Sequence, residues 1–191
     1  MSRLCQAILD FTSAIISEVS QQVKNGNLSS LAGVEIRRFE FSEQEQIRTI
    51  ALDVQSTNIV LKPSASKSTI VRFLARDESV DVGSQVTVKA NAGVLAISQL
   101  GKICTNFTVE VNVPDDVAIK AVSRSGNQVV KDLNTNELNI QTDSGNIVCK
   151  NVVAGSVTIH SRSGNIVAKA LVSRSDMTVE SENGNVVNKK A

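Results

Sequence analysis

The phrase Ser125-Gly126-Asn127 returns three more times, as Ser144-Gly145-Asn146, Ser163-Gly164-Asn165 and Asn183-Gly184-Asn185. Its glycines are 19, 19 and 20 residues apart. A short repeat of this length is typical of a solenoid, in which each repeat forms one coil that packs only against its neighbours. The sequence therefore predicts an all-β domain, a right-handed parallel β-solenoid or β-helix, with regular coils over residues 117–191.

Stacking the coils in register places equivalent residues in columns, with about 4.8 Å between successive members. Because strand residues alternate between the two faces of a sheet, every second column should point into the core. This reasoning predicts that Cys149 is a small buried hydrophobe and that His160, the one histidine, faces solvent. The columns expected in the core are Ile119, Leu138, Val157 and Met177; Ala121, Ile140, Ile159 and Val179; Gln128, Ile147, Ile166 and Val186; and Val130, Cys149, Ala168 and Asn188.

The repeated phrase itself is interpreted as a corner. Its glycine is expected to supply a positive φ, and its asparagines are expected to hydrogen-bond along the stack. The residue two before each glycine alternates in charge, which favours the correct order of the coils but contributes little stability. These residues are Arg124, Asp143, Arg162 and Glu182.

Two outward columns are not explained by folding alone. The first is an apolar stripe, which the N-terminal helix or a strand of the first half could cover, or which could form a groove for a partner. The second is a row of lysines, which either protects against edge-to-edge association or forms a track for an anion or polyanion. The stripe is Val129, Val148, Val167 and Val187, and the row is Lys131, Lys150, Lys169 and Lys189.

Residues 2–24 are expected to form an amphipathic helix that ends at Asn25-Gly26, because apolar residues recur there at steps of three and four. The helix could cap its own domain, pair with a copy or a partner, or lie on a membrane surface. The remaining boundaries are a linker over residues 27–33 and an irregular β half over residues 34–116, in which a degenerate coil pattern begins near residue 50. The apolar face of the helix, a candidate interface, contains Leu4, Ile8, Phe11, Ile15 and Val19.

The composition argues against several classes of function. The 20 Lys and Arg nearly balance the 19 Asp and Glu, so no overall charge draws the chain to nucleic acid or to a membrane. With 5 Phe and no Trp or Tyr, the usual residues for stacking on sugars and bases are scarce. Three scattered cysteines indicate neither a disulfide framework nor a metal site. No secretory signal or transmembrane segment is evident, so we expect a cytoplasmic bacterial protein without a cofactor, with non-classical export left open.

A family resemblance begins at Asn112-Val113-Pro114-Asp115-Asp116-Val117-Ala118-Ile119-Lys120. This strand end and turn, followed by Ser-Gly-Asn phrases at coil spacing, resemble the bacterial domain of unknown function called putative adhesin. The resemblance covers residues 50–187. It implies a right-handed β-solenoid-like fold and brings no catalytic residues with it.

Three classes of function remain. The first is a non-catalytic assembly or scaffold module, which could form homo-oligomers through the helix or the solenoid ends. The second is an adhesin-like binding module that uses the lysine and valine columns for a protein or an anionic polymer, without specific nucleic-acid binding. The third and most remote is a carbohydrate-active enzyme. Such enzymes need clustered carboxylates, whereas Asp143 and Glu182 lie two coils apart with Arg162 between them.

Overall fold

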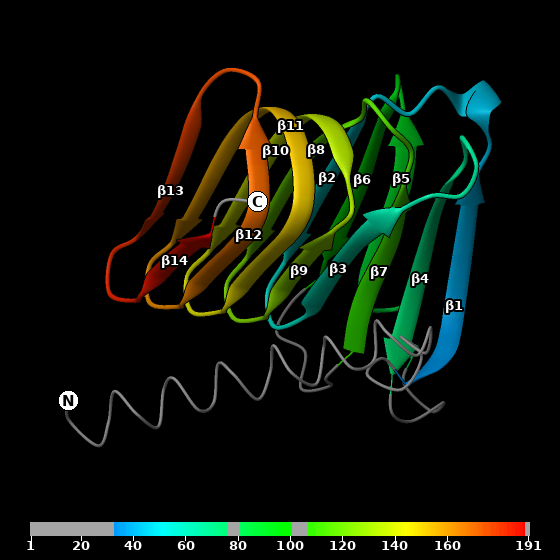
Figure 1. Ribbon diagram of the computed structural model, residues 1–191. Coiled ribbons are helices and arrows are strands. Elements are labelled where there is room, and N and C mark those ends of the chain that lie inside the picture. Colours follow the sequence, from blue (N-terminus) through cyan, green and yellow to red (C-terminus); the bar gives the residue numbers. More distant parts are fainter. Residues whose placement is uncertain (1–32, 76–80, 101–106, 190–191) are drawn as a thin grey trace.

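The computed structural model describes residues 33–75, 81–100 and 107–189. Their fourteen strands form one strongly curled sheet, with a short 3-10 helix, η2 (Glu43–Glu45), as the only helix among them (Figure 1). The all-β prediction is confirmed, whereas the helix predicted for residues 1–26 lies outside the described residues. Within those residues, no helix is long and apolar enough to cross a membrane. The strands are β1 (Val34–Phe41), β2 (Thr49–Val54), β3 (Asn58–Pro63), β4 (Thr69–Ala75), β5 (Val86–Asn91), β6 (Val94–Gln99), β7 (Phe107–Val113), β8 (Ala118–Ser123), β9 (Gln128–Lys131), β10 (Asn134–Thr142), β11 (Ile147–Ser161), β12 (Ile166–Ser173), β13 (Met177–Ser181) and β14 (Val186–Lys189).

The curled sheet has two halves, and each coil contributes one strand to each half (Figure 1). Half A consists, in order, of β1, β4, β7, β3, β9, the start of β11, the start of β12 and β14. Half B consists of β5, β6, β2, β8, β10, the end of β11 and β13. The long strand β11 passes from half A to half B at Asn151, whose φ of 52° turns the chain.

The coil pattern includes residues far from the regular repeat. Strand β2 pairs in parallel with β8, and β3 pairs in parallel with β9, so residues 49–63 form a coil that stacks on residues 118–131. Strands β6 and β7 stack on the other side of this coil. The spatial order of the coils therefore differs from their order in the sequence.

One end of the stack is closed by antiparallel strands. Strand β5 pairs antiparallel with β6, while β4 pairs antiparallel with β7 and β1 pairs antiparallel with β4. The sheet is therefore mixed, and the prediction of a purely parallel solenoid is wrong at this end. The reason is that β4 and the β5–β6 hairpin reverse the chain direction between coils. The sequence repeat does not indicate this reversal. The right-handed winding of the coils stays a prediction.

The space between the two halves holds the hydrophobic core. At the closed end, the ring of Phe73 packs against the rings of Phe39 and Phe107, with 6.1 Å between centroids in each pair. In the regular coils, the predicted inward columns are buried, as Leu138 and Ile147 illustrate. The prediction fails only in the last coil, where Met177 and Val186 are exposed because no further described coil stacks on them.

The glycines of the repeated phrase have a different role from the one predicted. None has a positive φ; that conformation occurs at the opposite corner, in Asp132, Asn151 and Ala170. A Cβ atom on Gly145 would collide with the backbone carbonyl of Gly126, one coil earlier, and the later coils repeat this arrangement. The glycines are therefore required because neighbouring coils approach too closely at this corner for any side chain.

The asparagines form the expected ladder. In each coil the backbone N–H of the asparagine donates to the side-chain oxygen of the asparagine in the coil before, for example from Asn146 to Asn127 at 3.1 Å. The ladder begins at Asn58, which accepts from the N–H of Asn127 at 3.0 Å. This confirms the predicted role of the asparagines and adds the coil of residues 49–63 to the ladder. The other steps are Asn165 to Asn146 and Asn185 to Asn165, each at 3.0 Å.

Candidate functional site

The lysine column, Lys131, Lys150, Lys169 and Lys189, is a single row on half A. The four lysines lie at paired positions on neighbouring strands, β9, β11, β12 and β14. Leu61 pairs with Val130, which places Lys62 beside Lys131 at the head of the row. Exposure falls along the row, since Lys189 and Lys169 are exposed, Lys150 is half-buried and Lys131 is only 5% exposed.

Lys131 differs from the solvent-facing lysine that alternation predicts. Burial lowers the pKa of its ammonium group, the neighbouring Lys150 lowers it further, and Asp132 partly opposes both effects. Within the described residues, the Lys131 ammonium has no hydrogen-bond or ion-pair partner. The alternation of strand residues determines to which face of the sheet a side chain points, but not how deeply it is buried. The burial of Lys131 depends on the strands on both sides of it and on the turn at Asp132.

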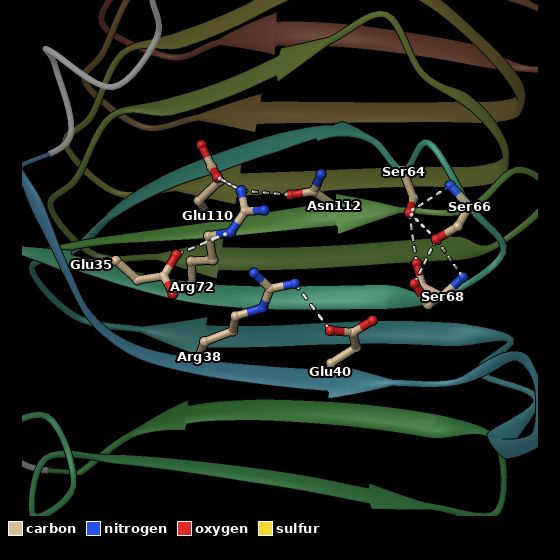
Figure 2. A network of polar contacts seen from close by, with 9 residues as sticks. All are labelled: Glu35, Arg38, Glu40, Ser64, Ser66, Ser68, Arg72, Glu110 and Asn112. Atoms are coloured by element: carbon tan, nitrogen blue, oxygen red, sulfur yellow. Dashed lines mark hydrogen bonds and ion pairs between the residues drawn. The ribbon is translucent and has the colours of Figure 1, made fainter.

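A buried carboxylate lies next to this row. Glu110 on β7 is 6% exposed, and its Oε1 lies 2.8 Å from Nζ of Lys62 and 2.7 Å from Nη1 of Arg72. Nε of Arg72 lies 3.2 Å from Oε2 of Glu35, so Arg72 joins two carboxylates (Figure 2). A buried charge must be paired, and this network satisfies Glu110 while occupying Lys62. Sequence reasoning missed it, although a glutamate at an outward position among valines was a signal.

The valine row contains the predicted stripe Val129, Val148, Val167 and Val187, which pairs in register across the same strands. Val60 on β3 pairs with Val129 and adds a fifth member, and Glu110 follows on β7. The described strands of the first half lie beside the row as members of the same sheet. They therefore do not cover it, and that part of the prediction is wrong.

The C-terminal end of the stack, seen at the left of Figure 1, is open. Among the described strands, β13 pairs only with β11 and β14 only with β12, so each has an unpaired edge. Met177 is 46% exposed and Val186 is 40% exposed, although Val157 and Ile166, their equivalents one coil earlier, are 1% and 0% exposed. An apolar cross-section of the core and two strand edges therefore meet on one surface.

Cys149 is buried, and His160, Asp143 and Glu182 are each paired with another side chain. Cys149 is completely buried as predicted, and burial raises the pKa of its thiol to about 12. Nε2 of His160 lies 3.2 Å from Oε1 of Glu182, and Nη1 of Arg162 lies 3.4 Å from Oδ1 of Asp143. Across the described ranges, no three His, Cys, Asp or Glu residues gather where they could hold a metal ion.

A shallow pocket of about 580 Å³ lies at one corner of the stack. Its lining includes Ser64, Ser66 and Lys67 from the β3–β4 loop and Glu43 from η2. Ser64 Oγ donates to the backbone oxygen of Ser68 at 2.8 Å, and Ser66 Oγ lies 2.6 Å from Ser68 Oγ (Figure 2). Lys67 Nζ pairs with Glu43 at 2.8 Å. These four side chains of the lining are therefore engaged with protein groups.

The extent of the coils agrees with a family model. A model described as Toastrack DUF4097 matches residues 47–189, from the start of the first stacked coil to the end of β14. The chain belongs to the Toastrack DUF4097 family. This confirms the resemblance to a domain of unknown function that the Ser-Gly-Asn phrases indicated. The candidate helix interface, Leu4, Ile8, Phe11, Ile15 and Val19, lies outside both the described residues and the matched Toastrack region.

Solved structures similar to this Toastrack chain include three bacterial proteins. A putative cell adhesion protein from Clostridium sporogenes is 8% identical, with 81% of this chain and 99% of that chain covered and a TM-score of 0.40. A putative adhesin from Bacteroides fragilis is 14% identical, with 81% and 95% covered and a TM-score of 0.42. A putative adhesin from Parabacteroides distasonis is 14% identical, with 80% and 95% covered and a TM-score of 0.31. A search of curated proteins finds no match.

Proposed function

We propose that this Toastrack chain is a non-catalytic assembly module that joins a second copy through the C-terminal end of its stack. The observation that carries the proposal is the exposure of Met177 and Val186 beside the unpaired edges of β13 and β14. Unpaired strand edges pair readily with another chain, and apolar surface gains free energy when it leaves water. Both tendencies act at the same surface here.

Two such ends can meet about a two-fold axis, the commonest symmetry of homodimers. Each edge strand then lies antiparallel to its own copy. With Val179 opposite the partner's Val179, Thr178 lies beside the partner's Glu180, so no two like charges face each other on β13. The two exposed apolar surfaces cover one another, and the sheet continues from one chain into the next.

The opposite end of the stack suits this contact less well. Its edge in half A is β1, on which Glu35, Arg37, Arg38 and Glu40 are exposed. Charged residues on an edge strand oppose pairing with another chain, because the charges would lose water. Contact between two C-terminal ends, rather than head-to-tail growth, is therefore the favoured geometry.

A non-catalytic role is supported by the state of the reactive groups. The Cys149 thiol is buried and protonated at neutral pH. Asp143 is engaged by Arg162 and Glu182 by His160. The paired, separated carboxylates that glycoside hydrolysis requires are therefore not available from these residues.

The test is sedimentation velocity or light scattering on the full chain over a range of concentrations. We expect dimers in the unmodified chain and monomers in Val186→Lys, since burying an unpaired charge in the contact is costly. Thr158→Lys, an exposed position one coil earlier, is the matched control and should stay dimeric. A concentration-independent monomer, or a dimer that survives Val186→Lys but not Ile15→Glu in the predicted helix, would refute end-to-end assembly.

A second candidate, binding of an anionic polymer, is favoured by the lysine column. Lys131 makes no hydrogen bond or ion pair with the described residues, and Lys169 and Lys189 are exposed at strand spacing. Retention on an immobilised polyanion at low salt should fall when Lys150 and Lys169 are both replaced by Gln, while Lys120→Gln on half B should leave it unchanged. Equal retention of all three proteins would exclude the track.

A further inference from the structure

The outer face of half A has two parallel rows of different character. The valine row runs from Val60 to Val187, and the lysine column runs beside it, two residues further along each strand. Residues two apart on a strand share a face. The surface is therefore an apolar strip flanked on one side by positive charge, which suits an amphipathic helix with acidic residues on one flank.

We propose that residues 2–24 of the same chain occupy this surface, as a helix that lies across the strands with its apolar side on the valine row. This inference concerns a different surface from the C-terminal end, so it holds or fails independently of the assembly proposed above.

The spacing of apolar residues matches the spacing of the strands. Leu4, Ile8, Phe11, Ile15 and Val19 recur once per helical turn, which is about 5.4 Å of rise. The valines recur once per strand, which is about 4.8 Å. From residue 4 to residue 19 a helix rises about 22 Å, and the five strands from β3 to β14 span about 19 Å. Each apolar turn of the helix can therefore pack close to one valine.

The place where the described chain begins also fits. Val34 starts β1, which belongs to half A, the half that carries the valine row. Three strand spacings, about 14 Å, separate β1 from β3, where the row starts with Val60. The linker of residues 27–33 can span up to about 23 Å when extended. The segment can therefore reach the row, and it would run from β3 toward β14 with Leu4 nearest Val187.

The charges complement one another in this orientation. At about 3.6 residues per turn, Glu18 borders the apolar side of the predicted helix, about 60° from its centre, whereas Asp10 lies on the opposite side. The lysine column offers positive charges at about 4.8 Å intervals, and Lys131 in particular is buried with no hydrogen bond or ion pair among the described residues, although the charge of Asp132 acts on it. A carboxylate from the segment would supply the counter-ion that a buried ammonium requires.

Disulfide trapping in the full chain tests the contact and its direction. Cys5 and Cys104 are first replaced by Ser, and Ile8→Cys is combined with Val167→Cys. We expect a cross-link within one chain under mild oxidation, seen as a mobility shift on a non-reducing gel and confirmed by peptide mapping. Ile8→Cys with Val60→Cys is the matched control and should not cross-link, because about 14 Å separates Val60 from Val167 and a disulfide needs Cα atoms within about 7 Å.

Each other outcome contradicts the proposal. Cross-links only between chains would show that the segment packs on a neighbouring copy. If Ile8→Cys formed no cross-link with a cysteine at Val129, Val148, Val167 or Val187, the segment would not lie on the valine row. Hydrogen exchange gives a second reading that does not depend on cysteines. Amides of residues 4–19 should exchange at least tenfold more slowly than in an unfolded peptide, with protection reduced by Glu18→Lys and restored when Lys131→Glu is added. Exchange at the unfolded rate in the unmodified chain would overturn the inference.

Discussion

Replacing Gly145 by alanine tests why the repeated glycine is required. The added Cβ would collide with the backbone carbonyl of Gly126, which cannot move aside as a flexible side chain could. Relief requires the coils to separate at this corner, where the Ser144 N–H donates to Arg124 at 2.8 Å and the Asn146 N–H donates to Asn127 at 3.1 Å.

The expected cost follows from these contacts. Overpacking costs about 1–3 kcal/mol, and weakening two hydrogen bonds adds about 1 kcal/mol each. Alanine stabilises through the unfolded chain by at most about 1 kcal/mol. The net loss should be about 3 kcal/mol, which for a domain of this size lowers Tm by about 10 °C. Thermal unfolding followed by circular dichroism measures it.

Two further variants make the test decisive. Gly83→Ala is the control with a small expected effect, because its Cβ would meet side-chain atoms of Arg37 and Asp81 and no backbone atom. Gly145→Asn distinguishes the two explanations, since asparagine tolerates a positive φ but still carries a Cβ. We expect Gly145→Asn to be at least as destabilised as Gly145→Ala. If the asparagine variant kept full stability while the alanine variant lost it, a positive φ and not close approach would be the requirement, and the reasoning would be wrong.

The remaining predictions concern charges, the asparagine ladder and the buried thiol. Glu110→Gln should lower the free energy of unfolding by about 3 kcal/mol in urea titrations, because it leaves Lys62 without its ion pair and Arg72 with only Glu35; Glu40→Gln, in an exposed pair, should cost under about 1 kcal/mol. The pKa of Lys131 is lower in the folded chain than its usual 10.5, so the folded state binds fewer protons and stability rises with pH as Lys131 deprotonates. Between neutral pH and pH 10.5, Tm should therefore rise more, relative to its neutral-pH value, in the unmodified chain than in Lys131→Met. The same change of Tm with pH in both proteins would contradict this. Asn146→Ala should cost about 1–2 kcal/mol by leaving the next coil's N–H without its acceptor, whereas Asn146→Asp, which keeps the acceptor, should recover most of it. Cys149 should react with a thiol reagent only at the rate of unfolding, and fast labelling in the native state would refute its burial.

The periodic part of the fold could be read from local pattern alone. Leu138, Ile140 and Ile147 are buried as alternation predicts, and the asparagine ladder joins the coils as expected. Both follow from the two-residue period of a strand and the 19-residue period of the coil. The degenerate pattern expected from near residue 50 also corresponds to the coil of residues 49–63, although its neighbour in space is residues 118–131.

The candidate surfaces were only partly accessible to such reasoning. The lysine and valine columns exist as rows, because in-register stacking follows from the repeat. The burial of Lys131 and the Glu110 network were missed, since they depend on β3 lying between β7 and β9, and the residues so paired are 50 and 69 positions apart in the sequence. The open C-terminal end was also missed, because alternation assigns Met177 and Val186 to the core without asking whether a further coil covers them.

The sequence by itself determined the coil length, the inward columns and the residues that can form ladders, because each depends on backbone geometry that repeats locally. Only the tertiary structure decided the order of the coils, the antiparallel closure at one end and the depth at which each outward residue lies. It also decided the role of the glycines, which the sequence marks but does not explain. Whether a residue needs an unusual φ or the absence of a Cβ depends on what lies about 4.8 Å away in the next coil, and that distance exists only once the chain has stacked.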